Sequence, residues 1–243
     1  MDLGLRDRVF VVTGGGAGLG FATAERLVAE GARVVLGGRD KNRLDAAVSR
    51  LGADHAEGVR ADNADPAAAD LLLSAAYSRF HRVDGLLVSV GGPPAGPVLA
   101  STDEDWRSSF ESVFLGAIRL ARTIGPRLGA GGSIAFVLST SVRSPIPELG
   151  ISNGLRPGLA MVAKSLSAEL GPKGVRVNGL MPGWIHTGRL RELTEEPDTS
   201  DIPLRRVGEP EEFGRVAAFV LSPAASYLTG AMIPVDGGRL PVL

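Results

Sequence analysis

The sequence contains no cysteine, and this absence excludes several kinds of chemistry. None of the 243 residues can form a disulfide, a thiolate metal site or a cysteine nucleophile. The formal net charge is only −1, and no block of like charges marks a basic surface for nucleic acid. We therefore expect neither a metal site nor a nucleic-acid partner.

Long hydrophobic runs, lysine and tyrosine are also scarce. No apolar run reaches membrane-spanning length, and the first residues, MDLGLRDR, lack the apolar core of a signal peptide. These absences predict a cytoplasmic protein with no membrane partner. Lysine and tyrosine, which many active sites use, occur only as Lys41, Lys164, Lys173, Tyr77 and Tyr227.

Glycine, in contrast, is abundant and clusters near the N-terminus. The stretch from Val9 to Glu30 reads VFVVTGGGAGLGFATAERLVAE, an apolar run, a glycine-rich turn and an amphipathic pattern. Glycines allow positive φ and close backbone approach, and a helix N-terminus offers free N–H groups and partial positive charge. The pattern predicts a pyrophosphate site, the alternative being a purely structural turn.

Strand-like and helix-like patterns alternate along the whole chain. This alternation predicts one α/β domain, a doubly wound Rossmann fold over residues 1–243 with a seven-stranded parallel sheet and helices on both faces. The irregular stretch from Thr187 to Pro203, called here the lid segment, is expected to cover the edge of the sheet. The expected strands are 9–12, 33–37, 55–60, 84–90, 133–138, 175–180 and 232–235, and the expected helices lie between them, at about 40–51, 66–80, 103–128, 152–170 and 209–221, besides the one after the glycine turn.

The spacing Thr-Gly-x3-Gly-x-Gly resembles the short-chain dehydrogenase/reductase family, and later landmarks extend the resemblance over most of the chain. Asp62 follows the third expected strand, where the family places an aspartate against adenine, and Met181-Pro182-Gly183-Trp184-Ile185-His186-Thr187 resembles its nicotinamide-holding turn. A solvated loop carboxylate is the alternative for Asp62. The resemblance assigns cofactor binding to Thr13, Gly14, Gly18, Leu19, Gly20, Arg39, Asp62, Gly91, Pro182, Gly183, Ile185 and Thr187.

The end of the second strand indicates which dinucleotide is preferred. An NAD site usually places an acid there for the ribose 2′-hydroxyl, whereas NADP requires a cation for the 2′-phosphate. Here Gly38 stands at the acid position and Arg39 follows it, with Asp40 placed to cap the next helix. We expect NADP(H) rather than NAD(H), the alternative being that Arg39 is a solvated turn residue.

The family's catalytic asparagine, tyrosine and lysine are not found at their expected positions. Val113 stands at the asparagine position, while Ser152 and Arg156 take the places of the Tyr-x-x-x-Lys pair. Pro157 biases Arg156 away from helical geometry, so this helix is expected to be kinked or to begin later. The substrate-orienting serine is retained, as Ser141 or, by its distance to Ser152, as Ser139.

These replacements leave two functional hypotheses. One is an NADP(H)-dependent oxidoreductase for a carbonyl/alcohol pair, similar to 3-oxoacyl-carrier-protein reductases, with Ser141, Ser152 and Arg156 facing the substrate. His186, or an ordered water, would then deliver the proton, unless this histidine is merely an exposed loop residue. The other is a dinucleotide-bound sensor or assembly protein without redox turnover. The resemblance also implies a homodimer or homotetramer.

Overall fold

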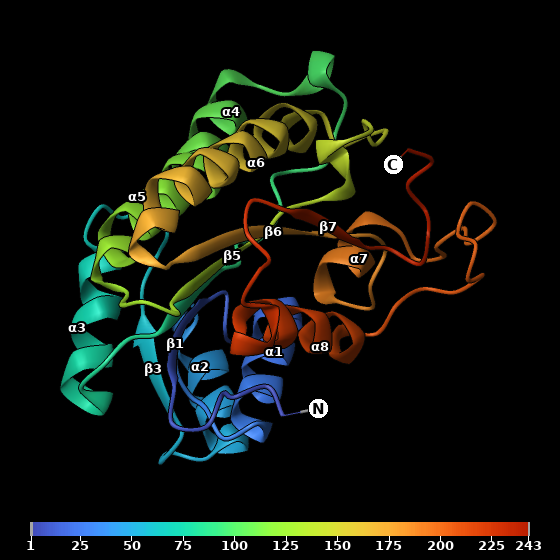
Figure 1. Cartoon of the computed structure of the whole chain (residues 1–243). Helices are drawn as coiled ribbons and strands as arrows, with labels where there is room; N and C mark the ends of the chain where they lie inside the picture. The colour runs from blue at the N-terminus through green and yellow to red at the C-terminus, as the bar shows by residue number, and fades with distance from the viewer. Residues whose placement is uncertain (1, 243) are drawn as a thin grey trace.

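A seven-stranded, all-parallel sheet forms the centre of the computed structural model, which describes residues 2–242 (Figure 1). The strand order is β3-β2-β1-β4-β5-β6-β7, so the chain reverses direction across the sheet beside β1. The prediction of seven parallel strands is confirmed. The strands are β1 (Val9–Thr13), β2 (Arg33–Gly38), β3 (Ala56–Arg60), β4 (Gly85–Val88), β5 (Ser133–Val137), β6 (Arg176–Pro182) and β7 (Met232–Val235).

Helices cover both faces of this sheet, as expected for a doubly wound fold (Figure 1). One face carries α3 (Ala68–Phe80), α5 (Gly116–Ile124) and α6 (Gly150–Leu170). The opposite face carries α1 (Gly18–Ala29), α2 (Lys41–Leu51) and α8 (Pro210–Leu221). Both layers therefore pack against the sheet while leaving the carboxyl ends of the strands at one edge.

The first strand shows how the sequence produces these two layers. Val9 and Val11 contribute to the core beneath α3, α5 and α6, whereas Phe10 and Val12 contribute to the core beneath α1, α2 and α8. Successive side chains of a strand point to opposite faces, so a continuous apolar run fits a strand that is buried on both sides. All four side chains are fully buried.

The helical region after β4 is longer and less regular than a single α-helix. It begins with α4 (Asp103–Ser109), capped by Thr102, whose side chain accepts from Asp105 N while the Asp105 carboxylate accepts from Thr102 N. A π-helical turn, η2 (Phe110–Leu115), then joins α4 to α5. Turns of this kind shift the register of a helix and often occur at functional sites.

The helix that carries Ser152 does not begin later than this residue; a later start is one of the two outcomes expected from Pro157. Helix α6 starts at Gly150 and continues to Leu170 with Pro157 inside it. Proline removes one backbone donor, but a helix of 21 residues retains its other bonds and packs against β6 and the 3₁₀ turn η4 (Thr140–Val142). Tertiary packing thus outweighs the local preference of the residue before proline.

The lid segment is more ordered than its composition suggests. It contains a short helix, α7 (Gly188–Leu193), whose N-cap Thr187 accepts a hydrogen bond from Leu190 N. Leu190 and Ile202 are buried and fix both ends of the segment to the domain. Among the described residues, no helix combines the length and apolar character needed to cross a membrane.

Candidate functional site

The glycine-rich turn after β1 is shaped by backbone contacts that no larger residue permits. Gly14 has φ of 61°, and a Cβ on it would lie 2.8 Å from Ser89 O. A Cβ on Gly20 would lie only 2.4 Å from Gly14 O, so the first turn of α1 packs directly on the loop. These close approaches leave the backbone of the turn bare toward the edge of the sheet.

The N-terminus of α1 is left open for an anion. Its N-cap is Ala17, which makes no side-chain cap, and its first turn contains no acidic residue. The first N–H groups of a helix have no partner inside the helix and carry partial positive charge. The loop thus has the form of a glycine cradle at an uncapped helix N-terminus, and pyrophosphate binding there stays a prediction.

A cavity of about 530 Å³ opens from this cradle along the carboxyl ends of β1 to β4. Open α/β sheets bind ligands at such a position, where the strand order reverses. The structure thus brings Gly14, Arg39, Asp62 and Gly91 together around one space. Other residues that line it are Gly16, Ala17, Gly38, Asp40, Arg43, Asn63, Ser89, Gly92, Ser108, Ser112 and Val113.

The end of the cavity beside β2 is cationic. Gly38 brings no acid to it, and the exposed side chains of Arg39 and Arg43 both line the space. Asp40 caps α2 by accepting from Arg43 N, as predicted, and its carboxylate also lies 3.3 Å from Arg43 Nε. Asp40 offsets the charge of Arg43, and Arg39 leaves this end of the cavity with a net positive charge.

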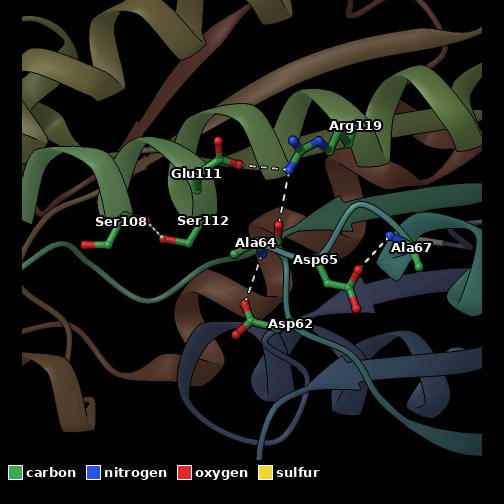
Figure 2. Close-up of polar contacts among 8 residues, drawn as sticks. All are labelled: Asp62, Ala64, Asp65, Ala67, Ser108, Glu111, Ser112 and Arg119. Carbon is green, nitrogen blue, oxygen red and sulfur yellow. Dashed lines mark hydrogen bonds and ion pairs between the residues drawn. The ribbon is translucent and has the colours of Figure 1, made fainter. Parts of the chain in front are cut away.

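Asp62 occupies a loop that is held rigidly against the helix above it (Figure 2). Its carboxylate accepts from Ala64 N at 3.0 Å. Arg119 on α5 donates to Ala64 O at 3.2 Å and pairs with Glu111 at 3.0 Å, which ties the loop to the helix. The exposed Asp62 side chain borders the cavity, consistent with the predicted contact to adenine.

The turn after β6 approaches the glycine loop from the other side. Ile185 is buried and pairs with Gly208 in an isolated bridge, while Gly183 N donates to Val235 O at 3.0 Å. An ideal Cβ on Gly18 would lie 3.7 Å from Thr187 Cγ2. The turn from Pro182 to Thr187 and the loop are thus neighbours, as a ligand spanning both requires.

The three predicted catalytic residues are all buried beside the carboxyl end of β5. Ser141 lies on η4, and Ser152 and Arg156 lie on α6, which packs against that turn. Ser139 Oγ accepts from Ser141 N at 3.1 Å, whereas Ser141 Oγ makes no hydrogen bond. Of the two candidate serines, Ser141 therefore keeps its hydroxyl available.

Arg156 is buried rather than exposed on the helix surface. It is 4% exposed, and its Nη1 donates to Val137 O at 2.7 Å. Burial, with a smaller contribution from the nearby Arg189 cation, lowers the pKa of Arg156 to about 10. A buried cation held by one carbonyl is a strong local source of positive potential.

The place of the family's catalytic asparagine is apolar. Val113, in the π-helical turn η2, is buried against Ile151 and Leu155 of α6 and borders the cavity. The helix can approach the loop after β3 because Gly116 follows: a Cβ there would lie 2.1 Å from Asn63 O. Val113 itself therefore offers packing and no hydrogen bond, whereas Ser108 and Ser112 of the same helical region bring hydroxyl groups to the cavity.

Histidine and tyrosine lie outside this group of residues. The His186 side chain is 54% exposed, with its Nε2 3.8 Å from Glu209 Oε1. Tyr77 and Tyr227 are exposed at the surface, on α3 and after α8. The described contacts of His186 thus favour its interpretation as an exposed loop residue.

The far end of the lid segment is fastened by the last part of the chain. Arg239 pairs with Asp201 at 2.8 Å and stacks over the Trp184 ring at 4.0 Å from its centroid. Leu204 N donates to Gly237 O at 3.2 Å. The near end is held by Arg189 of α7, whose Nη2 donates to Pro93 O at 2.5 Å.

Comparison with known proteins agrees with this geometry. A family model described as enoyl-(acyl carrier protein) reductase matches residues 14–239, almost the whole chain. Bovine (Bos taurus) dehydrogenase/reductase SDR family member 4 is 32% identical over 246 residues, covering 97% of this chain and 88% of that protein. The chain belongs to the short-chain dehydrogenase/reductase family.

Solved structures of this family superpose closely on the chain. L-sorbose reductase from Gluconobacter frateurii, complexed with NADPH and L-sorbose, has a TM-score of 0.92 with 30% identity and full coverage of both chains. 3-Ketoacyl-(acyl-carrier-protein) reductase from Brucella melitensis, complexed with NADH, has a TM-score of 0.91 with 31% identity, covering 97% of this chain and 99% of that one. A short chain oxidoreductase from Pseudomonas aeruginosa PAO1, described as containing an atypical catalytic center, has a TM-score of 0.91 with 31% identity over 99% of this chain and 100% of that one. Members of the short-chain dehydrogenase/reductase family are oxidoreductases that use a nicotinamide dinucleotide, and this chain shares their fold.

Several residues of this short-chain dehydrogenase/reductase site were missed by sequence reasoning. Arg43 carries an i, i+3 relation to Asp40 on α2, which could have revealed its pairing. Ser89 binds Thr13 in both directions, with its N–H donating at 2.9 Å and its carbonyl accepting at 2.8 Å. This contact between distant segments, like the approach of Arg189 to Arg156, leaves no signal in the local sequence.

Proposed function

We propose that the protein is an NADP(H)-dependent oxidoreductase that acts on a carbonyl/alcohol pair with an atypical set of catalytic residues. The observation that carries this proposal is the continuous cavity from the uncapped N-terminus of α1 to the two arginines at the end of β2. A dinucleotide with a 2′-phosphate matches both ends of this cavity in charge.

The residues present fit such a cofactor. Gly14, Gly18, Leu19 and Gly20 would hold the pyrophosphate against the first turn of α1. Arg39 would bind the 2′-phosphate with help from Arg43. Further contacts would come from Asp62 at the adenine, Gly91 beside the ribose, and Pro182, Gly183, Ile185 and Thr187 at the nicotinamide, while Thr13 fixes the loop through Ser89.

The chemistry that this cofactor supplies is hydride transfer at its nicotinamide ring. On the protein side, Ser152 in the first turn of α6 orients the substrate carbonyl, and Ser141 and Arg156 supply further donors. A serine hydroxyl is a poor acid at neutral pH and arginine stays charged, so the proton comes from water or from His186. The absence of a placed general acid lowers the rate by roughly 10²–10⁴ relative to members with tyrosine.

A sensor or assembly role is the alternative. The chain has the residues proposed to bind the cofactor, while Ser152 and Arg156 occupy the tyrosine and lysine positions. The proposed enzyme and this alternative share the cofactor and differ in turnover. The buried Arg156 and the unpartnered Ser141 hydroxyl favour the enzyme, since binding a dinucleotide at the glycine loop needs neither.

We also propose self-association into a homodimer or homotetramer in the cytoplasm, as the resemblance implies. The helices around α6 leave apolar side chains at the surface: Met161 is 67% exposed, and Phe110, stacked on Phe114 with 5.2 Å between the ring centroids, is 41% exposed. Apolar groups of this size at adjacent helices are typical of a surface that packs against another subunit.

Titration with NADPH and NADH, followed by quenching of tryptophan fluorescence, tests the cofactor. Turnover is then measured as NADPH oxidation with a panel of β-keto esters and diketones. We expect tight NADPH binding and carbonyl-dependent oxidation that falls in Ser141→Ala and Arg156→Ala. Tight binding without turnover on the panel would favour the sensor, and no binding of either dinucleotide would show that the glycine loop is only a turn.

A further inference from the structure

Two buried side-chain atoms have no hydrogen-bond partner among the residues that the structure describes, and they lie on adjoining elements. They are Ser141 Oγ on η4 and Arg156 Nε on α6. Buried polar atoms in folded proteins are almost always paired, because an unpaired donor loses its hydration without compensation. Two such atoms on elements that pack against each other suggest a group that could complete both hydrogen bonds.

The charge of Arg156 indicates what kind of group is needed. The charged neighbour that contributes to the lowered pKa of Arg156 is a second cation, Arg189. Nη1 donates to the neutral carbonyl of Val137. A buried charge without a counter-charge is costly, and neutral hydroxyl groups such as those of a ribose do not balance it.

We propose that Arg156 and Ser141 bind a carboxylate of the substrate, so that the oxidoreductase proposed above acts on an oxo acid and its hydroxy acid. Arg156 Nε and Ser141 Oγ each donate a hydrogen bond to this carboxylate, and the single guanidinium charge matches its single negative charge. Ser152, one turn before Arg156 on α6, then faces the carbonyl to be reduced.

The conversion balances with the cofactor of the proposed function. The carbonyl carbon gains a hydride from NADPH and the carbonyl oxygen gains a proton from solvent, which yields the hydroxy acid and NADP⁺. Since neither orphan atom touches solvent, the substrate enters by displacing neighbouring side chains. Helix α7 carries Arg189, the second cation that affects Arg156, and Arg189 is itself held by Pro93 O.

A matched pair of ligands tests the carboxylate separately from the carbonyl. Acetoacetate and methyl acetoacetate are titrated calorimetrically into the cofactor-free protein and into the protein saturated with NADP⁺. We expect acetoacetate to bind at least about tenfold more tightly than its ester, as charge-assisted hydrogen bonds require. Equal affinity for the two ligands, or binding of neither, overturns the proposal.

Variants then locate the preference. Arg156→Met should reduce acetoacetate binding to the level of the ester while ester binding stays within about twofold, which also shows that the variant is folded. Arg156→Lys keeps the charge without the Nε donor and should retain part of the preference. Arg143→Met is the matched control. This substitution removes the same charge as Arg156→Met, but from an exposed side chain at the end of η4.

The preference must survive in Arg143→Met, and equal losses in Arg143→Met and Arg156→Met would show a general effect of charge and refute the site. A separate NADPH titration distinguishes the two proposals. If no dinucleotide binds, the proposed function fails, while the carboxylate preference of the cofactor-free protein still decides the present proposal.

Discussion

Replacing Thr13 by valine removes a hydroxyl that holds the glycine loop to the neighbouring strand end. Thr13 is fully buried, and its Oγ1 donates to Ser89 O at 2.8 Å and accepts from Ser89 N at 2.9 Å. Valine has almost the same shape, so Thr13→Val leaves both backbone groups of Ser89 buried without partners. At about 1–3 kcal/mol for each unsatisfied group, we expect a loss of about 2–4 kcal/mol in the free energy of unfolding.

For a chain of this length, that loss corresponds to a fall of about 5–15 °C in Tm, measured by differential scanning calorimetry. Thr23→Val is the matched control: Thr23 is equally buried, but its hydroxyl only adds a bond to Leu19 O inside α1. Its effect should stay below about 1 kcal/mol. The reasoning is refuted if the two variants melt together, or if Thr13→Val loses cofactor affinity without losing stability.

Three further changes test other parts of the structure. Gly20→Ala places a Cβ 2.4 Å from the backbone oxygen of Gly14. It should lower the free energy of unfolding, measured in urea, by at least about 1–3 kcal/mol, and it should abolish NADPH binding in a fluorescence titration. Arg39→Gln should weaken NADPH roughly tenfold or more with little change for NADH; equal losses for both would place Arg39 away from the 2′-phosphate. Arg206 lowers the pKa of Glu212 to about 2. This carboxylate therefore stabilises the fold at pH values above its ordinary pKa, and the stabilisation is lost as the pH falls toward 2. Glu212→Gln should flatten the stability–pH curve in this acid range, and an unchanged curve there would contradict the role of this ion pair.

The sheet was predictable because its signal is repeated and local. Each strand is a short apolar run, and each run is followed by a helical pattern and a turn, so an error at one boundary does not alter the order of elements. The glycine loop was predictable for the same reason. Gly20 is required by its close approach to Gly14 O within the same loop, whereas the approach of Gly14 to Ser89 O joins distant segments and could not be read from the loop.

The surroundings of Arg156 were not predictable in this way. The local preference imposed by Pro157 indicated a disturbed helix, yet α6 is continuous because it packs along its whole length on β6 and η4. The burial of Arg156 depends on distant parts of the chain. Its hydrogen-bond partner Val137 lies on β5, and the neighbouring cation Arg189 lies on α7. A single sequence contains no periodicity that links them.

The two serines that the sequence left open differ in their hydrogen bonds. Ser139 Oγ accepts from Ser141 N and keeps its own O–H, whereas Ser141 Oγ has no partner among the described residues, and the choice between them stays a prediction. Such a distinction depends on the exact fold of a turn of three residues, which propensity does not determine.

The contacts of Arg239 with Asp201 and Trp184 have a practical consequence for anyone who handles this protein. Arg239 follows β7 and anchors the lid segment, so the last few residues help to hold that segment in place. Carboxypeptidase trimming past Arg239 would release that anchor, and a bulky affinity tag there would strain it. A purification tag therefore belongs at the other end of the chain.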